Sequence, residues 1–222
     1  MSSKVSELQT DSTVPGNRAT PGTLFVVSSP SGGGKGTLIR RVLQLVPDLS
    51  YSVSYTTRAP RNGEVAGREY FFIDRAAFEE MAEANEFLEW ACVHGNLYGT
   101  AKRQVSVETS AGLDIIVEVD VQGAQSIRKL TLDSVSIFIL PPSYEILKQR
   151  LIARGTDSPQ ELEVRLRNAP EELRQFSCFN YVIINDDVER AAAELAAIVH
   201  AERARCERQQ ELVERVIENF QQ

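Results

Sequence analysis

The sequence predicts a three-layer α/β protein with a parallel central sheet flanked by helices. Continuous apolar runs without polar alternation occur at 24–27, 114–119, 136–140 and 181–184, as in strands that are buried on both faces. Helical patterns separate these runs, and parallel neighbours need such crossover connections. A third observation is the glycine-rich turn that joins the first run to the first helix.

That turn, at 29–37, reads Ser-Pro-Ser-Gly-Gly-Gly-Lys-Gly-Thr. Glycines between a strand and a helix let successive N–H groups face one anion, and the helix N-terminus adds positive potential, so the turn is typical of a phosphate-binding P-loop. Lys35 can then reach the outer phosphates of a nucleotide. Ser29 stands where the usual pattern has its first glycine, and Gly36 where it has a hydroxyl, so Thr37 supplies the hydroxyl near a metal. A flexible turn without a ligand is the alternative interpretation.

The first helix follows at once and is ended by Pro47, which cannot continue it. Its predicted buried stripe is Leu38, Val42, Leu45 and Val46.

The pattern of apolar and aromatic residues changes between about residues 50 and 96. Short strand candidates rich in Tyr and Phe occur at 51–55, 69–73 and 87–93, around one helix at 75–84 that Asp74 is expected to cap. We interpret this stretch as a small inserted α+β subdomain.

A second insertion, from about 154 to 176, is charged and arginine-bearing, and its position between two buried strands indicates a helical lid. Pro170 falls inside its helical pattern, where proline costs about 3 kcal/mol. We therefore predict a break or kink there, with Asn168 or Ala169 capping a new segment. The end of the chain, from Val188 to about Phe220, is predicted as a packing helix.

That last helix is expected to be capped at Asp186 and Asp187. Its predicted apolar stripe is Ala192, Leu195, Ile198 and Val199. Three terminal apolar residues could serve either packing or a subunit contact, and they are Leu212, Val216 and Phe220.

Composition limits the class of protein. The 222 residues are 42% hydrophobic and carry a formal net charge of −7, which disfavours a nucleic-acid partner. The sequence shows neither an apolar run of bilayer length nor a signal-peptide pattern, so we expect a cytoplasmic protein without a membrane contact. The three widely spaced cysteines and the isolated His94 and His200 suggest neither a disulfide framework nor a metal site. Residues 1–21 have the composition of a disordered tail.

Eight segments, in one order along the chain, are similar to the guanylate kinase family. They are 29–37, 54–61, 63–65 with 67–71, 86–90, 95–100, 118–123, 150–156 and 184–187. The resemblance runs from Gly22 to the C-terminal helix. It implies a P-loop kinase fold with a core (22–49, 97–153 and 178–201), a GMP-binding insertion (50–96), a lid (154–177) and a C-terminal helix extension (202–222).

The family's reaction is transfer of the γ-phosphoryl group of ATP to GMP with Mg²⁺, in purine nucleotide metabolism. On this resemblance, the expected ATP site comprises Pro30, Ser31, Gly32, Gly33, Gly34, Lys35, Gly36, Thr37 and Asn185. Arginines neutralise a transferring phosphoryl group well, and those matching the family's catalytic positions are Arg58, Arg150, Arg154 and Arg165. Arg167 lies on the same return of the lid, but its role stays open.

The acceptor nucleotide is expected in the insertion. Arg58 and Arg61 lie three apart in a loop, which suits a clamp on the acceptor phosphate, and the resemblance adds Tyr70 and Tyr98 to it. Guanine presents two neighbouring donors that a carboxylate can accept together, and Glu89, in an otherwise apolar strand, is the candidate acceptor. The resemblance places Ser54 and Thr100 beside it.

Two acids end the run at 114–119. The period of two puts Glu118 and Asp120 on one face at the carboxyl end of a strand, where open α/β sheets bind ligands. Either could hold Mg²⁺ through water together with Thr37, and the resemblance links Asp120 to GMP.

Two other functions remain as alternatives. One is a catalytically silent guanylate-kinase-like module that binds phosphorylated partners, against which the intact Lys35 argues. The other is a kinase of the same fold that acts on another phosphorylated acceptor, such as AMP or a ribose phosphate. The sequence leaves open whether the protein is a monomer or a homo-oligomer.

Overall fold

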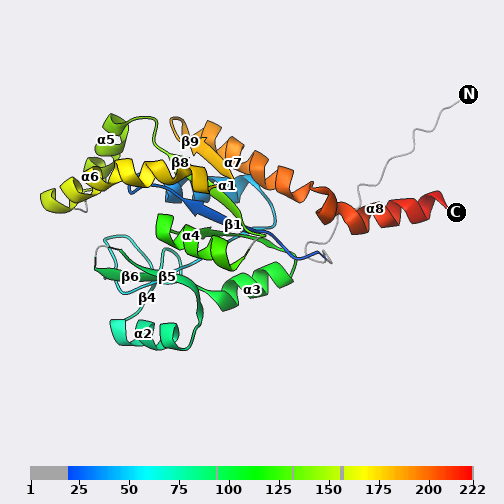
Figure 1. Cartoon of the computed structure of the whole chain (residues 1–222), viewed down its shortest axis with the longest axis horizontal. Coiled ribbons are helices and arrows are strands. Elements are labelled where there is room, and N and C mark those ends of the chain that lie inside the picture. Colours follow the sequence, from blue (N-terminus) through cyan, green and yellow to red (C-terminus); the bar gives the residue numbers. More distant parts are fainter. Residues whose placement is uncertain (1–19, 94, 132, 156–157, 222) are drawn as a thin grey trace, which may run out of the picture.

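The computed structural model describes residues 20–93, 95–131, 133–155 and 158–221 (Figure 1). The expected tail at 1–21 therefore falls almost wholly outside the described residues, as does His94. The central sheet has five parallel strands in the order β2-β7-β1-β8-β9, which confirms the predicted α/β class. Their bounds are β1 (Leu24–Ser28), β2 (Leu49–Ser52), β7 (Asp114–Glu118), β8 (Val135–Leu140) and β9 (Tyr181–Ile184).

Helices cover both faces of this sheet, which gives the predicted three layers. Phe25 and Val27 of β1 pack in one apolar cluster with α1 (Lys35–Leu45) and α7 (Val188–Arg203). Leu24 and Val26, on the opposite face, pack in a second cluster with α3 (Lys102–Ser110) and α4 (Val121–Leu130). Because successive side chains of a strand alternate between faces, the single run at 24–27 serves both clusters.

The stripe of α1 differs from the prediction at one position. Leu45 is 42% exposed, whereas Ile39 is 2% exposed and packs in the core. Leu45 is the last residue of α1, and the buried residues of that helix are Leu38, Ile39 and Val42. Val46 is the C-cap residue and Pro47 follows, as predicted.

A second sheet, in the order β4-β3-β6-β5, forms the insertion. Its elements are β3 (Tyr55–Thr56), β4 (Phe71–Phe72), α2 (Arg75–Glu83), β5 (Phe87–Val93) and β6 (Asn96–Ala101). The predicted cap is confirmed, because Asp74 accepts a hydrogen bond of 2.8 Å from the N–H of Ala77. Phe78, Phe87 and Leu97 make a small core of its own beneath α2.

The predicted start of this insertion is wrong. The strand expected at 51–55 is divided between the two sheets, and β2 pairs in parallel with β7 at the edge of the central sheet. Tyr51 packs against the main core, an environment that its sequence pattern could not distinguish from a strand of the smaller sheet. The insertion sheet also extends beyond the expected limit at 96, because β6 continues to Ala101.

The segment predicted to be a lid, called the lid below, follows β8 with α5 (Tyr144–Arg154) and α6 (Pro159–Arg174), and the 3₁₀ helix η1 (Gln175–Cys178) leads back to β9. A reciprocal capping box between Ser158 and Glu161 begins α6. Of the break or kink predicted at Pro170, the break is wrong, since α6 continues through it to Arg174, and the kink stays a prediction. Proline removes only one backbone N–H donor from the helix. Ala169, the residue before it, is buried in the apolar cluster between α6 and α5, and this packing holds the helix in place.

The C-terminal region forms two helices rather than the single one predicted. α7 is capped by Asp187, which accepts from the N–H of Arg190 at 2.9 Å, and it ends at Arg203. After Ala204 and Arg205, α8 (Cys206–Phe220) extends away from the body of the molecule (Figure 1). Gln209 donates to the carbonyl of Arg203 at 2.7 Å, which satisfies an acceptor at the end of α7.

None of the described helices has the length and apolar character needed to cross a membrane.

Candidate active site

The loop between β1 and α1 has the geometry of an anion cradle. Gly32 and Gly34 have φ values of 89° and 92°, which favour glycine, and a Cβ on Gly33 would lie 2.7 Å from the hydroxyl of Ser29. Lys35 begins α1, and its Nζ donates to Ser29 Oγ at 3.2 Å and to the Ser29 carbonyl at 3.4 Å. Ser29, the departure from the usual pattern, therefore holds the lysine over the loop.

Two residues from distant segments support the same loop. Asn185, just after β9, donates from its side-chain amide to the carbonyl of Gly33 at 3.0 Å. Arg150 of α5 donates to the carbonyl of Asn185 at 2.8 Å and reaches Gly33 at 3.5 Å. Both residues line a cavity of about 360 Å³, which also contains the predicted phosphate-binding residues from Gly32 to Thr37.

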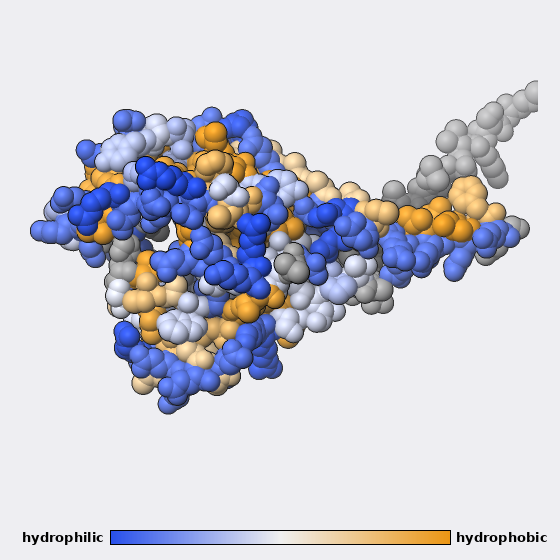
Figure 2. Space-filling view, in the orientation of Figure 1, coloured by the Kyte–Doolittle hydropathy of each residue, from blue (hydrophilic) through white to orange (hydrophobic). Residues whose placement is uncertain are grey.

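A larger cavity, of about 790 Å³, lies between the P-loop, the insertion, α4 and the lid. Figure 2 shows this hollow between α6 above and the insertion below. The cavity brings together predicted residues from segments that are far apart in sequence. They are Ser31, Gly32, Lys35, Ser54, Arg58, Arg61, Tyr70, Glu89, Tyr98, Glu118, Asp120, Arg165 and Arg167.

The arginine loop of the insertion is braced by an acid that the sequence analysis did not single out. Arg58 donates to both carboxylate oxygens of Glu64 at 2.9 Å, and its guanidinium lies 5.4 Å from the ring centre of Tyr70. The backbone N–H of Arg61 donates to the same carboxylate at 2.8 Å. Glu64 lies three residues after Arg61, and this spacing was the available signal for a brace across a turn.

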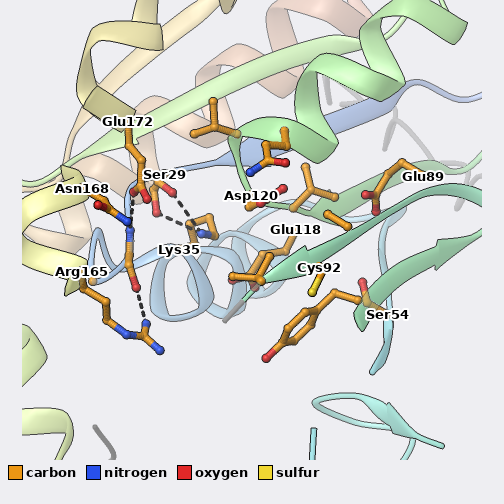
Figure 3. Close-up of a pocket in the computed structure, with 18 of the residues that line it drawn as sticks. Ser29, Lys35, Ser54, Glu89, Cys92, Glu118, Asp120, Arg165, Asn168 and Glu172 are labelled. Atoms are coloured by element: carbon orange, nitrogen blue, oxygen red, sulfur yellow. Dashed lines mark hydrogen bonds between the residues drawn. The ribbon is translucent and has the colours of Figure 1, made fainter. Parts of the chain in front are cut away.

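Glu89 is the buried acid of the cavity, at 8% exposure. Its Oε1 accepts a hydrogen bond of 2.7 Å from the hydroxyl of Thr100 on β6, and Ser54 lines the same cavity. Burial, with a smaller effect from the charge of Asp120, raises the pKa of Glu89 to about 7. In Figure 3, Glu89 and Ser54 lie together on the side away from Ser29 and Lys35.

The two acids at the end of β7 have different surroundings. Glu118 lines both cavities, shares the smaller one with Thr37, and accepts from the Tyr51 hydroxyl at 3.4 Å. Asp120 lines the larger cavity and caps α4, accepting from the N–H of Gly123 at 2.8 Å. Within the described part of the chain, no group of three or more His, Cys, Asp or Glu side chains forms a metal cage.

The lid contacts the P-loop directly. Arg165 donates to the hydroxyl of Ser31, and the backbone N–H of Ser31 donates to Glu172 at 3.2 Å. Asn168 and Glu172 line the larger cavity although the sequence analysis gave them no role there. The spacing i, i+3, i+7 from Arg165 puts all three on one face of α6, which was the signal available. The side chain of Arg154 lies outside the described part of the structure.

A parallel sheet with a lysine-bearing phosphate loop, an adjoining cavity and an arginine-bearing lid defines the class of P-loop kinases. The protein-family comparison places the chain more narrowly. The family model described as guanylate kinase matches residues 21–202, and the chain belongs to this family.

Individual relatives agree with this assignment. The guanylate kinase of Symbiobacterium thermophilum is 50% identical over 184 residues, which cover 83% of this chain and 87% of the relative. That of Dechloromonas aromatica is 49% identical over 81% of this chain and 89% of its own. The crystal structure of guanylate kinase from Anaplasma phagocytophilum has a TM-score of 0.74 at 33% identity, covering 88% of this chain and 95% of that chain.

Proposed function

We propose that this chain transfers the γ-phosphoryl group of ATP to GMP, giving ADP and GDP. The observation that carries the proposal, beside family membership, is that the P-loop cavity and the Glu89 cavity adjoin and share lining residues. Both are lined by Ser29, Gly32, Lys35 and Glu118, so a donor on the P-loop and an acceptor in the insertion meet at the lysine.

On the donor side, the work of the protein is positioning and charge neutralisation. A nucleoside monophosphate is doubly charged near neutral pH, because its second pKa is about 6, so its phosphate needs no general base to become a nucleophile. Lys35 lines both cavities, Arg150 lines the smaller one and Arg165 the larger, and these three cations suit the charge that spreads over a transferring phosphoryl group. Arg154, one turn after Arg150, is proposed to join them.

On the acceptor side, we assign the phosphate to the clamp of Arg58 and Arg61 with Tyr70 and Tyr98. The guanine base is assigned to Glu89, with the hydroxyls of Ser54 and Thr100 beside it. Guanine offers its N1–H and amino group to the carboxylate, whereas adenine would leave a buried acceptor unpaired, a loss of roughly 1–3 kcal/mol. Asp120 borders the same cavity and is assigned to the acceptor nucleotide.

Magnesium fits the oxygen donors present. The hydroxyl of Thr37 and the carboxylate of Glu118 line one cavity beside the P-loop, and Mg²⁺ is usually bound by one or two carboxylates, phosphates and retained water. When bound, the ion would neutralise phosphate charge. Glu118 is the better candidate of the two acids because it borders the donor cavity, while Asp120 uses one oxygen to cap α4.

We assign the protein to the cytoplasm. Its three cysteines are free thiols, as a reducing compartment maintains them, and its nucleotide substrates are intracellular metabolites.

The direct test is ADP formation from ATP and Mg²⁺ with GMP, AMP, CMP or UMP as acceptor. Turnover with GMP alone, and its loss on chelation of Mg²⁺, is the expected result. Efficient turnover with another monophosphate would instead identify a kinase of the same fold with a different acceptor. Nucleotide binding without turnover of any acceptor would favour the silent binding module.

A further inference from the structure

Gly123 lies inside a helix, and its backbone conformation is one that does not require glycine. It is the third residue of α4, is buried, and is not among the residues with positive φ. Glycine is less favourable in a helix than any ordinary residue except proline, so an alanine would favour α4 unless something occupies the space of its side chain.

The space is occupied by the carboxyl group of Glu89. A Cβ built on Gly123 would lie 2.6 Å from Glu89 Oε2 and 3.1 Å from Glu89 Cδ, and it would also lie 3.1 Å from Val119 Cβ. Separations below 3.0 Å force something to move. The carboxyl group of Glu89 therefore lies against the bare α-carbon at the start of α4.

This contact fixes how the carboxylate is presented to the cavity. Oε1 is held by the Thr100 hydroxyl at 2.7 Å, and Oε2 lies beside Gly123. Glu89 is on the insertion sheet, whereas Gly123 is on the core, where its N–H donates to Asp120 at 2.8 Å. Any side chain at position 123 would push the carboxyl group off Thr100 or into the space left for a base.

We propose that Gly123 is a specificity-determining positioning residue, whose missing side chain lets Glu89 take the orientation that reads guanine. The inference rests on the proposed function, because it concerns the base reader of that reaction. Gly123 itself need not touch the substrate. It acts through Glu89, and its substitution should affect the acceptor base while sparing the ATP site.

The test compares Gly123→Ala with wild type for KM of GMP, KM of ATP, and the ratio of kcat/KM for GMP over AMP. We expect the GMP KM to rise and the ratio to fall, each by about tenfold or more, with the ATP KM within about twofold of wild type. Titration calorimetry of GMP without ATP should show the same loss. Ser126→Ala, on the exposed side of the same helix, is the matched control and should leave all three quantities unchanged.

A double-mutant cycle with Glu89→Ala separates positioning from general packing of α4. Without the Glu89 side chain, adding Gly123→Ala should change GMP affinity by less than about twofold. If Gly123→Ala alone failed to fold, recovery of folding by Glu89→Ala would support the clash, and no recovery would overturn it. An unchanged GMP KM and base ratio in folded Gly123→Ala would overturn the inference alone. Wild-type protein that turned over no GMP would overturn the proposed function with it.

Discussion

Replacing Glu89 by glutamine tests the assignment of the base reader most directly. Glutamine has the same shape, and its carbonyl oxygen can still accept from Thr100, which now donates to Oε1 at 2.7 Å. The amide nitrogen then falls where Oε2 lies beside Gly123. The amide nitrogen is a hydrogen-bond donor, whereas the carboxylate oxygen that it replaces is an acceptor. In the variant a donor would therefore oppose the donors of guanine.

The size of the effect follows from this exchange. A hydrogen bond to a charged group contributes about 1.5–3 kcal/mol, and opposed buried donors add a penalty of roughly 1–3 kcal/mol. The total, about 2.5–6 kcal/mol, corresponds to a fall of roughly 10²–10⁴ in kcat/KM for GMP, with little change for AMP. The fold should not suffer, because the substitution removes a carboxyl group that is 8% exposed and replaces it with a neutral group.

Steady-state kinetics with GMP and AMP, together with a thermal unfolding curve, provide the measurement. The expected outcome is a lost preference for GMP in a protein whose melting temperature is equal to or higher than that of wild type. A ratio of kcat/KM for GMP over AMP within about threefold of wild type would refute the assignment of Glu89 as the reader.

Three further predictions concern pH, catalysis and stability. Burial raises the pKa of Glu89 from 4.5 to about 7, so between these pH values the folded protein retains a proton that the unfolded chain has lost. The free energy of unfolding should therefore fall with rising pH across this range, by roughly 3 kcal/mol relative to Glu89→Gln. The GMP KM should also fall towards pH 8, because Glu89 is then ionised. A flat difference between the two denaturation series would contradict this. Lys35→Met should lower kcat by about 10²–10³ while GMP still binds, as rapid-quench and calorimetric measurements would show. Arg203→Met leaves buried Asp114 without the ion pair of 2.6 Å and should reduce the free energy of unfolding in urea by about 3 kcal/mol or more with kcat unaltered, whereas an equal midpoint would show that the pair contributes nothing.

The sequence allowed the central fold to be predicted because its signals are local. Apolar runs marked the buried strands β1, β7, β8 and β9, and the glycines before Lys35 marked the phosphate loop. Asp74 and Asp187 were recognisable as caps because a capping side chain bonds to a backbone only a few residues away. The described residues assigned to the two nucleotides also line the cavities, apart from Pro30 and from Thr100, which contacts the cavity residue Glu89 instead, because a family motif preserves their order along the chain.

The features that were missed depend on long-range packing. Leu49–Ser52 joins the central sheet through its pairing with β7, more than sixty residues away in sequence. Pro170 stays helical because neighbouring Ala169 is buried against α5, and helix propensity takes no account of such tertiary packing. Glu64 and Glu172 acquire their positions only when the chain has folded, by bracing Arg58 and meeting the P-loop.

The contact between Glu89 and Gly123 also links the insertion to the core, two parts of the molecule that the chain itself connects at two crossings. β5 belongs to the insertion sheet and α4 to the core, and the chain passes between these two bodies only before β3 and after β6. A rotation of the insertion about those two crossings would change the distance between Glu89 and Gly123 more than any distance within either body. A pair of spectroscopic labels across this boundary would therefore report any rotation of the insertion relative to the core, and so any change in the width of the acceptor half of the cavity.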